Sequence, residues 1–388
     1  MRSEWREVPL KELALINRDN YSTNDDWSYV NYLDTSNITK GAIDDIKYLD
    51  LKYDKLPSRA RRKVERNDIV YSMVRPDQEH YGIIKKPLSN MLVSTGFVTI
   101  TAKDGANAPY LYYFISQPQI TSYLQALAEQ RVSTYPALNV TDISNLKVIV
   151  PPLPTQKAIA ATLSCMDAKI EVNNKIIKNL EQQAQAIFKS WFVDFEPFQD
   201  GEFVESELGL IPKGWRAGSL GEIIKITSGK RPKARQERKD SLFRYPLFGA
   251  SGIMGYTSAY LYNEKIITIG RVGTHGKVQE ISEASWPSDN TLVIMPKHYG
   301  FVASVLKAID YGALNRGSTQ PLITQTDIKN TKIVVPATEI LGKFEDMYKM
   351  YFNLSRTINT QNTTLSALRD TLLPKLMSGE IEVPVEQG

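Results

Sequence analysis

The chain has 388 residues, 42% of them hydrophobic and 23% charged, with a net charge of +4, so it has apolar material for two cores and is not a wholly disordered chain. Its single cysteine, Cys165, excludes an internal disulfide framework, and together with three widely separated histidines it leaves little for a metal site. No apolar run approaches the roughly 18 residues of a membrane span and the first residues lack the apolar core of a signal peptide, so we expect a cytoplasmic protein with no bound metal and no membrane contact.

Residues 1–154 are predicted to form a first domain of mixed α and β structure. Alternating apolar runs at residues 68–74 and 96–102 indicate strands, and the longer apolar stretch at residues 109–127 indicates helices. Residues 59–66 of this domain carry five basic side chains. Clustered Lys and Arg neutralise phosphates and release counterions, which makes the cluster a candidate DNA contact, although a solvated charged face explains such a run equally well.

Residues 155–198 are predicted to form one long helix. Their apolar positions recur at alternating steps of four and three residues, the heptad spacing of a coiled-coil seam, and Asn173 is a polar member of it. With Thr155 as candidate N-cap the helix would be about 60 Å long, too long for one globular core, although ordinary core helices are the alternative. The predicted seam residues are Ile159, Leu163, Met166, Ile170, Ile177, Leu180, Ile187 and Trp191.

Residues 199–337 are predicted to repeat the first domain. Five collinear matches have offsets that never rise along the chain, which indicates a duplicated domain with deletions in its second copy. In the last match ten of nineteen residues are identical. The matches pair Trp215 with Trp5 (offset 210), residues 263–271 with 67–75 (196), Gly276 with Gly82 (194), residues 288–294 with 94–100 (194) and residues 318–336 with 133–151 (185).

The second copy holds the excess positive charge, because residues 201–336 carry 18 basic and 12 acidic side chains. Arg271 and Arg75 each follow an apparent strand at what reads as the same place in the repeat. A guanidinium at a strand exit can read guanine or hold a phosphate, and a structural salt bridge is the alternative. The predicted DNA-binding residues are Arg59, Arg61, Arg62, Lys63, Arg75, Lys230, Arg231, Lys233, Arg235, Arg271 and Lys277.

Residues 338–388 are predicted to hold a second long helix with its own heptad seam. One row of this seam matches the first helix at an offset of 185, whereas the other row is displaced by one residue, and Pro374 should end or kink the helix. We expect the two helices to pack as an antiparallel coiled coil with the globular copies at opposite ends, and Asn173 and Gln361 to fix its register. The predicted seam residues here are Phe344, Tyr351, Leu354, Ile358, Leu365 and Leu372.

The sequence carries no recognisable catalytic signature. The glycine-rich stretch at residues 270–277 has the wrong spacing for a phosphate loop, and no Ser, His and Asp set stands out among three histidines. We therefore predict no catalytic residues and favour a binding protein.

The sequence resembles the specificity subunits of type I restriction-modification systems over essentially its whole length. The resemblance is carried by the tryptophans that open the two copies, by the central stretch QAIFKSWFVDFEPF and by LRDTLLPKLMSGEI near the end. It implies an α+β fold in which two tandem, pseudo-symmetric mixed α/β target recognition domains are separated by two long helices packed as an antiparallel coiled coil.

The resemblance also implies a function. The chain would be a non-catalytic, sequence-specific subunit in which each recognition domain binds one half of a split target in double-stranded DNA. It would recruit two methyltransferase subunits that use S-adenosylmethionine and two restriction subunits that use ATP and Mg, and would bind no cofactor itself. The alternative that we keep open is a non-catalytic interaction scaffold, built from a duplicated protein-binding module on a coiled coil.

Overall fold

The computed structural model of the chain describes residues 4–131, 136–271, 276–312 and 323–384. Its contacts form two compact units, the first made of Met1–Val172 with Gln361–Gly388 and the second of Asn173–Thr360. Two helices of 40 residues each, α5 (Leu153–Phe192) and α8 (Thr338–Met377), contribute one half to either unit. The four-part division predicted at residues 154, 198 and 337 stays a prediction, because the contacts group the helix halves with the units.

The first unit holds two four-stranded sheets, ordered β2-β11-β8-β9 and β6-β3-β10-β7, and the two-stranded pairs β1-β12 and β4-β5. Apolar residues of the first sheet share one core with the helices α2 and α3. The helices are α1 (Leu10–Leu13), α2 (Ala108–Ile115), α3 (Pro118–Arg131) and α4 (Val140–Ser144). The strands are β1 (Arg6–Pro9), β2 (Ala14–Ile16), β3 (Tyr29–Leu33), β4 (Ile38–Thr39), β5 (Ala42–Ile43), β6 (Lys47–Asp50), β7 (Ala60–Lys63), β8 (Ile69–Ser72), β9 (Tyr81–Ile83), β10 (Met91–Ser94), β11 (Phe97–Ala102) and β12 (Lys147–Val150).

The second unit repeats this plan with fewer strands. The order β16-β22-β19-β20 reproduces the first sheet, β18-β17-β21 reproduces three strands of the second, and the pairs β15-β23 and β13-β14 are separate. The helices are α6 (Tyr299–Ala308) and α7 (Gln325–Lys329). The strands are β13 (Phe203–Ser206), β14 (Gly209–Pro212), β15 (Arg216–Ser219), β16 (Ile224–Ser228), β17 (Tyr245–Phe248), β18 (Ile253–Thr257), β19 (Ile266–Gly270), β20 (Val278–Ile281), β21 (Trp286–Pro287), β22 (Thr291–Pro296) and β23 (Lys332–Val335).

Strand registers confirm the offsets 210, 194 and 185. Arg6 lies opposite Val150 in β1-β12, and Arg216 lies opposite Val335 in β15-β23, which are the same positions shifted by 210 and 185. Ile16 lies opposite Ile100, and its counterpart lies opposite Ile294, as an offset of 194 requires. The repeat is therefore a duplicated set of hydrogen-bonded strands. Residues 133–135 and 318–322 of the matched stretch lie outside the described residues.

The offset of 196 predicted for β8 and β19 is wrong by two residues. Tyr71 lies opposite Val98 in the first unit, and Ile269 lies opposite Leu292 in the second, so the offset between these strands is 198. A shift of two residues keeps every side chain on its own face of a sheet, which is why the sequences still matched. The pairing of Gly82 with Gly276 fails too, since Val70 lies opposite Gly82 and its counterpart Thr268 lies opposite Gln279.

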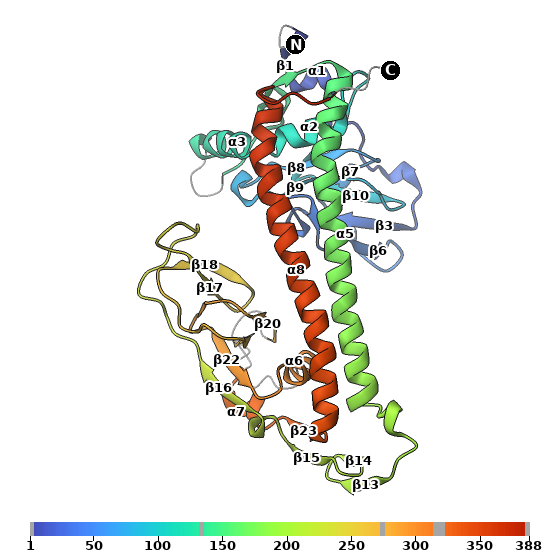
Figure 1. Cartoon of the computed structure of the whole chain (residues 1–388). Coiled ribbons are helices and arrows are strands. Elements are labelled where there is room, and N and C mark those ends of the chain that lie inside the picture. The colour runs from blue at the N-terminus through green and yellow to red at the C-terminus, as the bar shows by residue number, and fades with distance from the viewer. Residues whose placement is uncertain (1–3, 132–135, 272–275, 313–322, 385–388) are drawn as a thin grey trace. The chain divides into compact units, whose positions relative to one another are not determined.

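The halves of α5 and α8 lie side by side within each unit and run in opposite directions (Figure 1). In the first unit, Asp167 of α5 accepts a hydrogen bond from Arg369 of α8 at 2.7 Å. In the second unit, the rings of Phe188 and Phe192 pack against Phe344 with centroids 6.2 and 5.0 Å apart. The predicted antiparallel pairing of long helices is confirmed, and in both units the helices complete the core.

The predicted seam of α5 is well placed, because Ile159 and Leu163 are buried and the other predicted members are half-buried. Asn173, its polar member, is 1% exposed. The seam of α8 follows the prediction only in one row, which comprises Phe344, Tyr351, Ile358, Leu365 and Leu372, all buried or half-buried.

The second predicted row of α8 is wrong by one residue. Leu354 is 48% exposed, and Gln361 is exposed as well. The buried or half-buried row lies one position later and keeps the offset of 185 from α5, and it comprises Leu341, Tyr348, Ser355, Asn362, Arg369 and Leu376. Three polar residues fill its middle, so a search for apolar residues selected the neighbouring, solvent-facing row.

Both predicted helix limits also need correction. Pro374 does not end helix α8, which continues to Met377, and the predicted alternative of a kink stays a prediction. The proline removes one backbone hydrogen bond, while Leu373, Leu376 and Met377 are buried in the core of the first unit. Helix α5 begins at Leu153, two residues before the predicted cap Thr155. Pro154 fits the first turn because its missing N–H has no helical partner there.

Candidate nucleic-acid interface

One loop in each unit leads into the second sheet of that unit, which is β6-β3-β10-β7 in the first unit and β18-β17-β21 in the second. These two corresponding loops have opposite net charges. In the first unit residues 17–28 join β2 to β3, and in the second residues 229–244 join β16 to β17. Strand β3 pairs antiparallel with β6 and parallel with β10, as β17 does with β18 and β21. Residues 17–28, the acidic loop, carry one basic and three acidic side chains, whereas residues 229–244, the basic loop, carry seven basic and two acidic ones.

The basic cluster predicted in the first unit lies on β7 and beside it, and two of its members, Arg62 and Lys63, are bound by their own chain. Lys63 Nζ lies 2.5 Å from an oxygen of Asp25 and 3.6 Å from one of Asp19, both in the acidic loop, and stands over the ring of Trp27. The hydrogen bond from Lys63 lowers the pKa of Asp25, and the same bond raises the pKa of Lys63. The positive charge of Lys63 is therefore already balanced by two carboxylates of its own chain, which leaves it poorly suited to bind a phosphate.

The neighbouring arginines divide between the interior and the surface. Arg62 Nε donates to the carbonyl of Phe97 at 2.9 Å, and burial lowers the pKa of its guanidinium. Arg61 is half-buried and Arg59, in the turn before β7, is exposed. Of the four predicted DNA-binding residues in this cluster, only Arg59 is exposed.

Arg75 and Arg271 do not occupy equivalent places, contrary to the prediction. The amide of Met73 donates to Gly96 and the amide of Arg271 donates to Asn290, which lies at the offset of 194 from Gly96. The counterpart of Arg271 is therefore Met73, and Arg75 lies two residues further on. Arg75 is exposed with a left-handed backbone, φ 47°, whereas Arg271 directly follows β19 and is half-buried.

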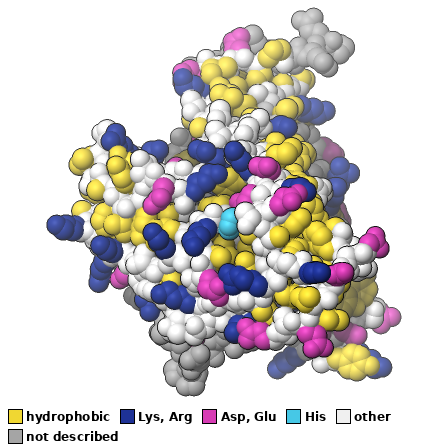
Figure 2. Space-filling model, turned by 60° about the horizontal axis from the view of Figure 1, so that its bottom comes forward, with side chains coloured by type: hydrophobic (Ala, Val, Ile, Leu, Met, Phe, Trp, Pro, Cys, Tyr) yellow, Lys and Arg dark blue, Asp and Glu magenta, His cyan; other side chains and the backbone are white. Residues whose placement is uncertain are grey.

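In the second unit, Lys230, Arg231, Lys233 and Arg235 of the basic loop are all exposed. Lys277, predicted with them, is exposed too, and its ammonium donates to the carbonyl of Ser251 at 2.7 Å. Figure 2 shows, on the left of its view, many separate Lys and Arg side chains with few Asp or Glu side chains among them. The second unit therefore offers an accessible cationic surface.

Side chains that the prediction missed extend this surface. Arg244, at the end of the basic loop, lies over the ring of Tyr245 at 5.0 Å and donates to its hydroxyl at 2.9 Å. Tyr245 packs edge-on against Tyr260, which is 47% exposed. In the first unit Tyr29 occupies the corresponding start of β3 and stacks on the exposed Tyr48. The offset of 210 does not reveal this pair, because Tyr245 lies 216 positions after Tyr29 and the segment before it is longer in the second unit.

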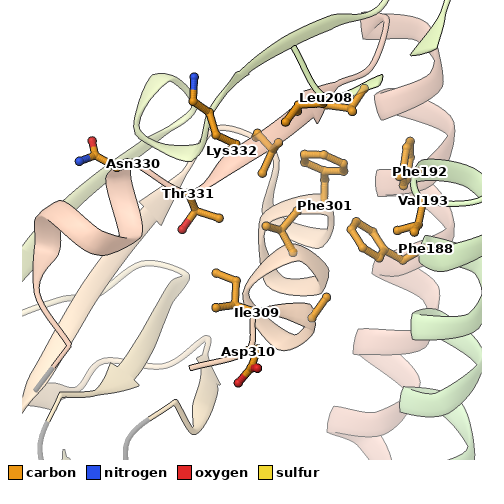
Figure 3. Close-up of a pocket in the computed structure, with 14 residues that line it drawn as sticks. Phe188, Phe192, Val193, Leu208, Phe301, Ile309, Asp310, Asn330, Thr331 and Lys332 are labelled. Atoms are coloured by element: carbon orange, nitrogen blue, oxygen red, sulfur yellow. The ribbon is translucent and has the colours of Figure 1, made fainter. Parts of the chain in front are cut away.

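A cavity of about 610 Å³ in the second unit lies between α5, α6 and β23. Figure 3 shows Phe188, Phe192 and Phe301 facing one another across it, while the polar ends of Asn330 and Lys332 point away. Lys332 is paired with Glu207 at 2.8 Å. The lining is mostly apolar, and Lys332, its cation, points away from the cavity, so its chemistry suits apolar side chains.

Two other kinds of site are absent from residues 4–131, 136–271, 276–312 and 323–384. Among those residues no group of three or more His, Cys, Asp or Glu side chains could hold a metal ion. No helix in the same part of the chain has the length and apolar character needed to cross a membrane. Residues 272–275 of the glycine-rich stretch lie outside the described residues.

A family model and two curated relatives, all type I restriction specificity proteins, match most of this chain. The family model described as type I restriction modification DNA specificity domain matches residues 2–182 and 212–368, one match for each copy of the repeat. The type I restriction enzyme MjaIX specificity subunit of Methanocaldococcus jannaschii is 32% identical over 332 residues, which cover 78% of this chain and 75% of the relative. The HindI specificity subunit of Haemophilus influenzae is 25% identical over 464 residues, covering 98% of this chain and all of the relative.

A solved structure shares the fold. The crystal structure of the type I restriction-modification system S subunit from M. genitalium matches with a TM-score of 0.54 at 17% identity, covering 96% of either chain.

Proposed function

This chain belongs to the family of type I restriction-modification specificity subunits, and on that premise we propose that it binds one split, asymmetric DNA sequence, with one half-site for each unit and no catalysis of its own. The observation that carries the proposal is the duplication of one strand framework with unlike loops. Equivalent strands keep their order and register, while the corresponding loops differ in length and in the sign of their charge. Two related folds with different surfaces suit two different half-sites.

Base reading and phosphate binding fall to different residues in this proposal. Exposed arginines at strand exits and loop ends, such as Arg75 and Arg244, have the planar guanidinium that reads guanine edges. Exposed cations of the basic loop hold the sugar-phosphate backbone and fix the register on the duplex.

Methyltransferase and restriction subunits are the proposed partners, two copies of each, with S-adenosylmethionine, ATP and Mg bound by those partners. Exposed apolar side chains on the long helices support a protein contact there. Met350 is 74% exposed and Leu354 is 48% exposed, one turn apart on the second-unit half of α8. Apolar side chains grouped on a helix surface mark interaction sites.

The experiment that tests the proposal is methylome sequencing of cells that carry this chain with a matching methyltransferase subunit. We expect one bipartite sequence to be methylated, and its methylation to disappear when this chain is deleted. Methylation that persists without the chain, or that falls on a continuous sequence, would contradict the proposal.

We further propose that the paired helices set the gap between the half-sites. Seven residues inserted into α5 after Val172 and seven into α8 after Thr360 keep the heptad phase and lengthen both helices by about 10 Å, the rise of about three base pairs. The methylated sequence should keep both halves and gain about three base pairs between them. An unchanged gap in an assembled, active complex would refute the role of the helices as a spacer.

A scaffold that binds only proteins remains the second candidate, supported by the exposed apolar residues of α8. The two functions differ in their response to salt, because binding to DNA releases counterions and weakens steeply as salt rises. A chain that assembles with its methyltransferase but gives that complex no sequence preference on DNA would be a scaffold.

A further inference from the structure

We infer that the basic loop, residues 229–244, is the main phosphate-binding element of this protein, and that the second unit therefore supplies most of the salt-dependent part of its affinity for DNA. The inference rests on the proposed function and adds to it an unequal division of labour between the two units. The first unit would bind its half-site with little contribution from the acidic loop and β7, which occupy the corresponding region.

The first anchor of the basic loop lies at its start. The amide of Gly229 donates to Thr291 and that of Lys230 donates to Pro287, both at 3.0 Å, and Trp286 Nε1 donates to the carbonyl of Lys230 at 2.7 Å. A Cβ on Gly229 would lie 2.2 Å from the carbonyl oxygen of Ser288, so only glycine allows this approach. The backbone of Lys230 is thus held while its side chain is exposed.

Two further anchors fix the middle and the end of the loop. Gln236 and Tyr256 exchange backbone hydrogen bonds of 3.1 and 2.8 Å, across the position where Gly255 leaves room for the chain. The carboxylate of Asp240 accepts hydrogen bonds from the amide of Phe243, the side chain of Gln236 and the amide of Leu242, which lower its pKa. A loop fixed at three points loses less conformational entropy on binding than a free one.

Five of the seven cations of the loop lie between the anchors. Arg231, Lys233 and Arg235 separate the first anchor from the second, and Arg238 and Lys239 separate the second from the third. All five are exposed, and within the described part of the chain none of them forms an ion pair with a carboxylate. A structured backbone that presents unpaired cations to solvent is suited to a polyanion, whereas a merely solvated face has no need of such anchoring.

The first unit cancels its own charge in the corresponding region. Asp19 and Asp25 of the acidic loop hold Lys63, and Arg18 of the same loop pairs with Glu65 at 2.7 Å. A cation already paired with a carboxylate of its own chain displaces few counterions from DNA. In the first unit the acidic loop and Lys63 are therefore paired with each other, whereas the five cations between the anchors of the basic loop have no carboxylate partner in the described part of the chain.

Salt dependence of DNA binding measures this difference directly. The complex of this chain with its methyltransferase subunit is titrated with its methylated sequence and with unrelated DNA, between roughly 50 and 200 mM salt. The triple variant R231Q/K233Q/R235Q should lower the slope of log affinity against log salt by about 2.7, at about 0.9 for each phosphate contact. Lys233→Gln alone should lower it by about 0.9, while the matched variant Lys63→Gln should leave it unchanged.

Several results would overturn the inference. The triple variant could keep the wild-type slope, Lys63→Gln could lower the slope as much as Lys233→Gln, or the triple variant could impair assembly with the methyltransferase, which would make the basic loop a protein contact. An unchanged thermal midpoint of the triple variant shows that the loop still folds. If the wild-type complex shows no preference for its own sequence, the proposed function itself fails; if that preference is intact and the slope is not altered, only the role of the loop fails.

Discussion

Replacement of Ile358 and of Leu354 distinguishes the two candidate seams of α8. Both are apolar residues of the same helix, both were predicted to face α5, and both lie in the second unit. Ile358 is 6% exposed, whereas Leu354 is 48% exposed. Only Ile358 should therefore contribute substantially to the stability of the isolated chain.

The expected magnitudes follow from burial. Full burial of an isoleucine side chain is worth about 1.5 to 3 kcal/mol, and truncation to alanine adds a cavity term, so Ile358→Ala should cost at least about 2 kcal/mol. A unit of this size loses roughly 2 to 4 °C of melting temperature per kcal/mol, which predicts a decrease of about 4 to 8 °C. Leu354→Ala should change the unfolding free energy by less than about 0.5 kcal/mol, as an exposed substitution does.

Differential scanning calorimetry of the two variants, in the chain without partners, measures this contrast. Calorimetry is preferred because two units need not melt in one transition. Equal shifts for the two variants, or a larger shift for Leu354→Ala, would show that the apolar row read from the sequence faces α5 after all. In the complex with the methyltransferase, Leu354→Ala should instead weaken assembly, as the proposed contact of the exposed face requires.

Two further predictions concern charged groups of the first unit. Arg369→Met leaves Asp167, and the Tyr113 hydroxyl that donates to Asp167, without their cation. The variant should lower the unfolding free energy by about 1 to 3 kcal/mol. This is less than for a fully buried pair, because both side chains retain some solvent exposure. The double variant R369M/D167L should recover part of this loss in urea unfolding, and no recovery would show that the ion pair is not the cause. The hydrogen bond from Lys63 lowers the pKa of Asp25 in the folded chain. The contribution of ionised Asp25 to stability is therefore complete above its pKa in the unfolded chain, near 3.8, and is lost as the pH falls through its lower pKa in the folded chain. The stabilities of wild type and Asp25→Asn should therefore converge only below about pH 3.8 in acid titrations of unfolding, and a difference that shrinks at neutral pH would contradict the assignment.

The repeat was predictable because the residues that define it are constrained by backbone geometry. Trp5 and Trp215 open equivalent strands, and the matched stretch after residue 136 folds into a short helix and a strand in either unit. The register of β19 was not predictable to better than two residues. Its sequence alternates in the same way at both registers, and only the hydrogen bonds to β22 distinguish them.

The seam of α8 and the first basic cluster failed for a common reason. A seam search selects apolar residues, yet Asn362 and Arg369 occupy seam positions, and Arg369 is held there by Asp167. A charge search selects basic runs, yet the charge of Lys63 is balanced by carboxylates that lie about 40 residues away in the chain. In both cases the side chain that decides the outcome is distant in sequence and close in space, so local patterns carry no information about it.

Comparison of equivalent positions separates substitutions that preserve the framework from those that change the surface. Asn139 and Thr324 differ in identity, but each is the N-cap of a short helix, and the carboxylate of the aspartate three residues later accepts a hydrogen bond from its amide, at 2.7 Å to Asp142 and 3.0 Å to Asp327. The exchange keeps the cap and so keeps the entry into the following strand. The acidic and basic loops, by contrast, join equivalent strands of the two units but differ in length, in charge and in how their side chains are paired. The framework tolerates this divergence without a change in strand register. Differences in recognition between the two units are therefore expected in these loops and in the tyrosines and arginines beside them, and not in the strands that the copies share.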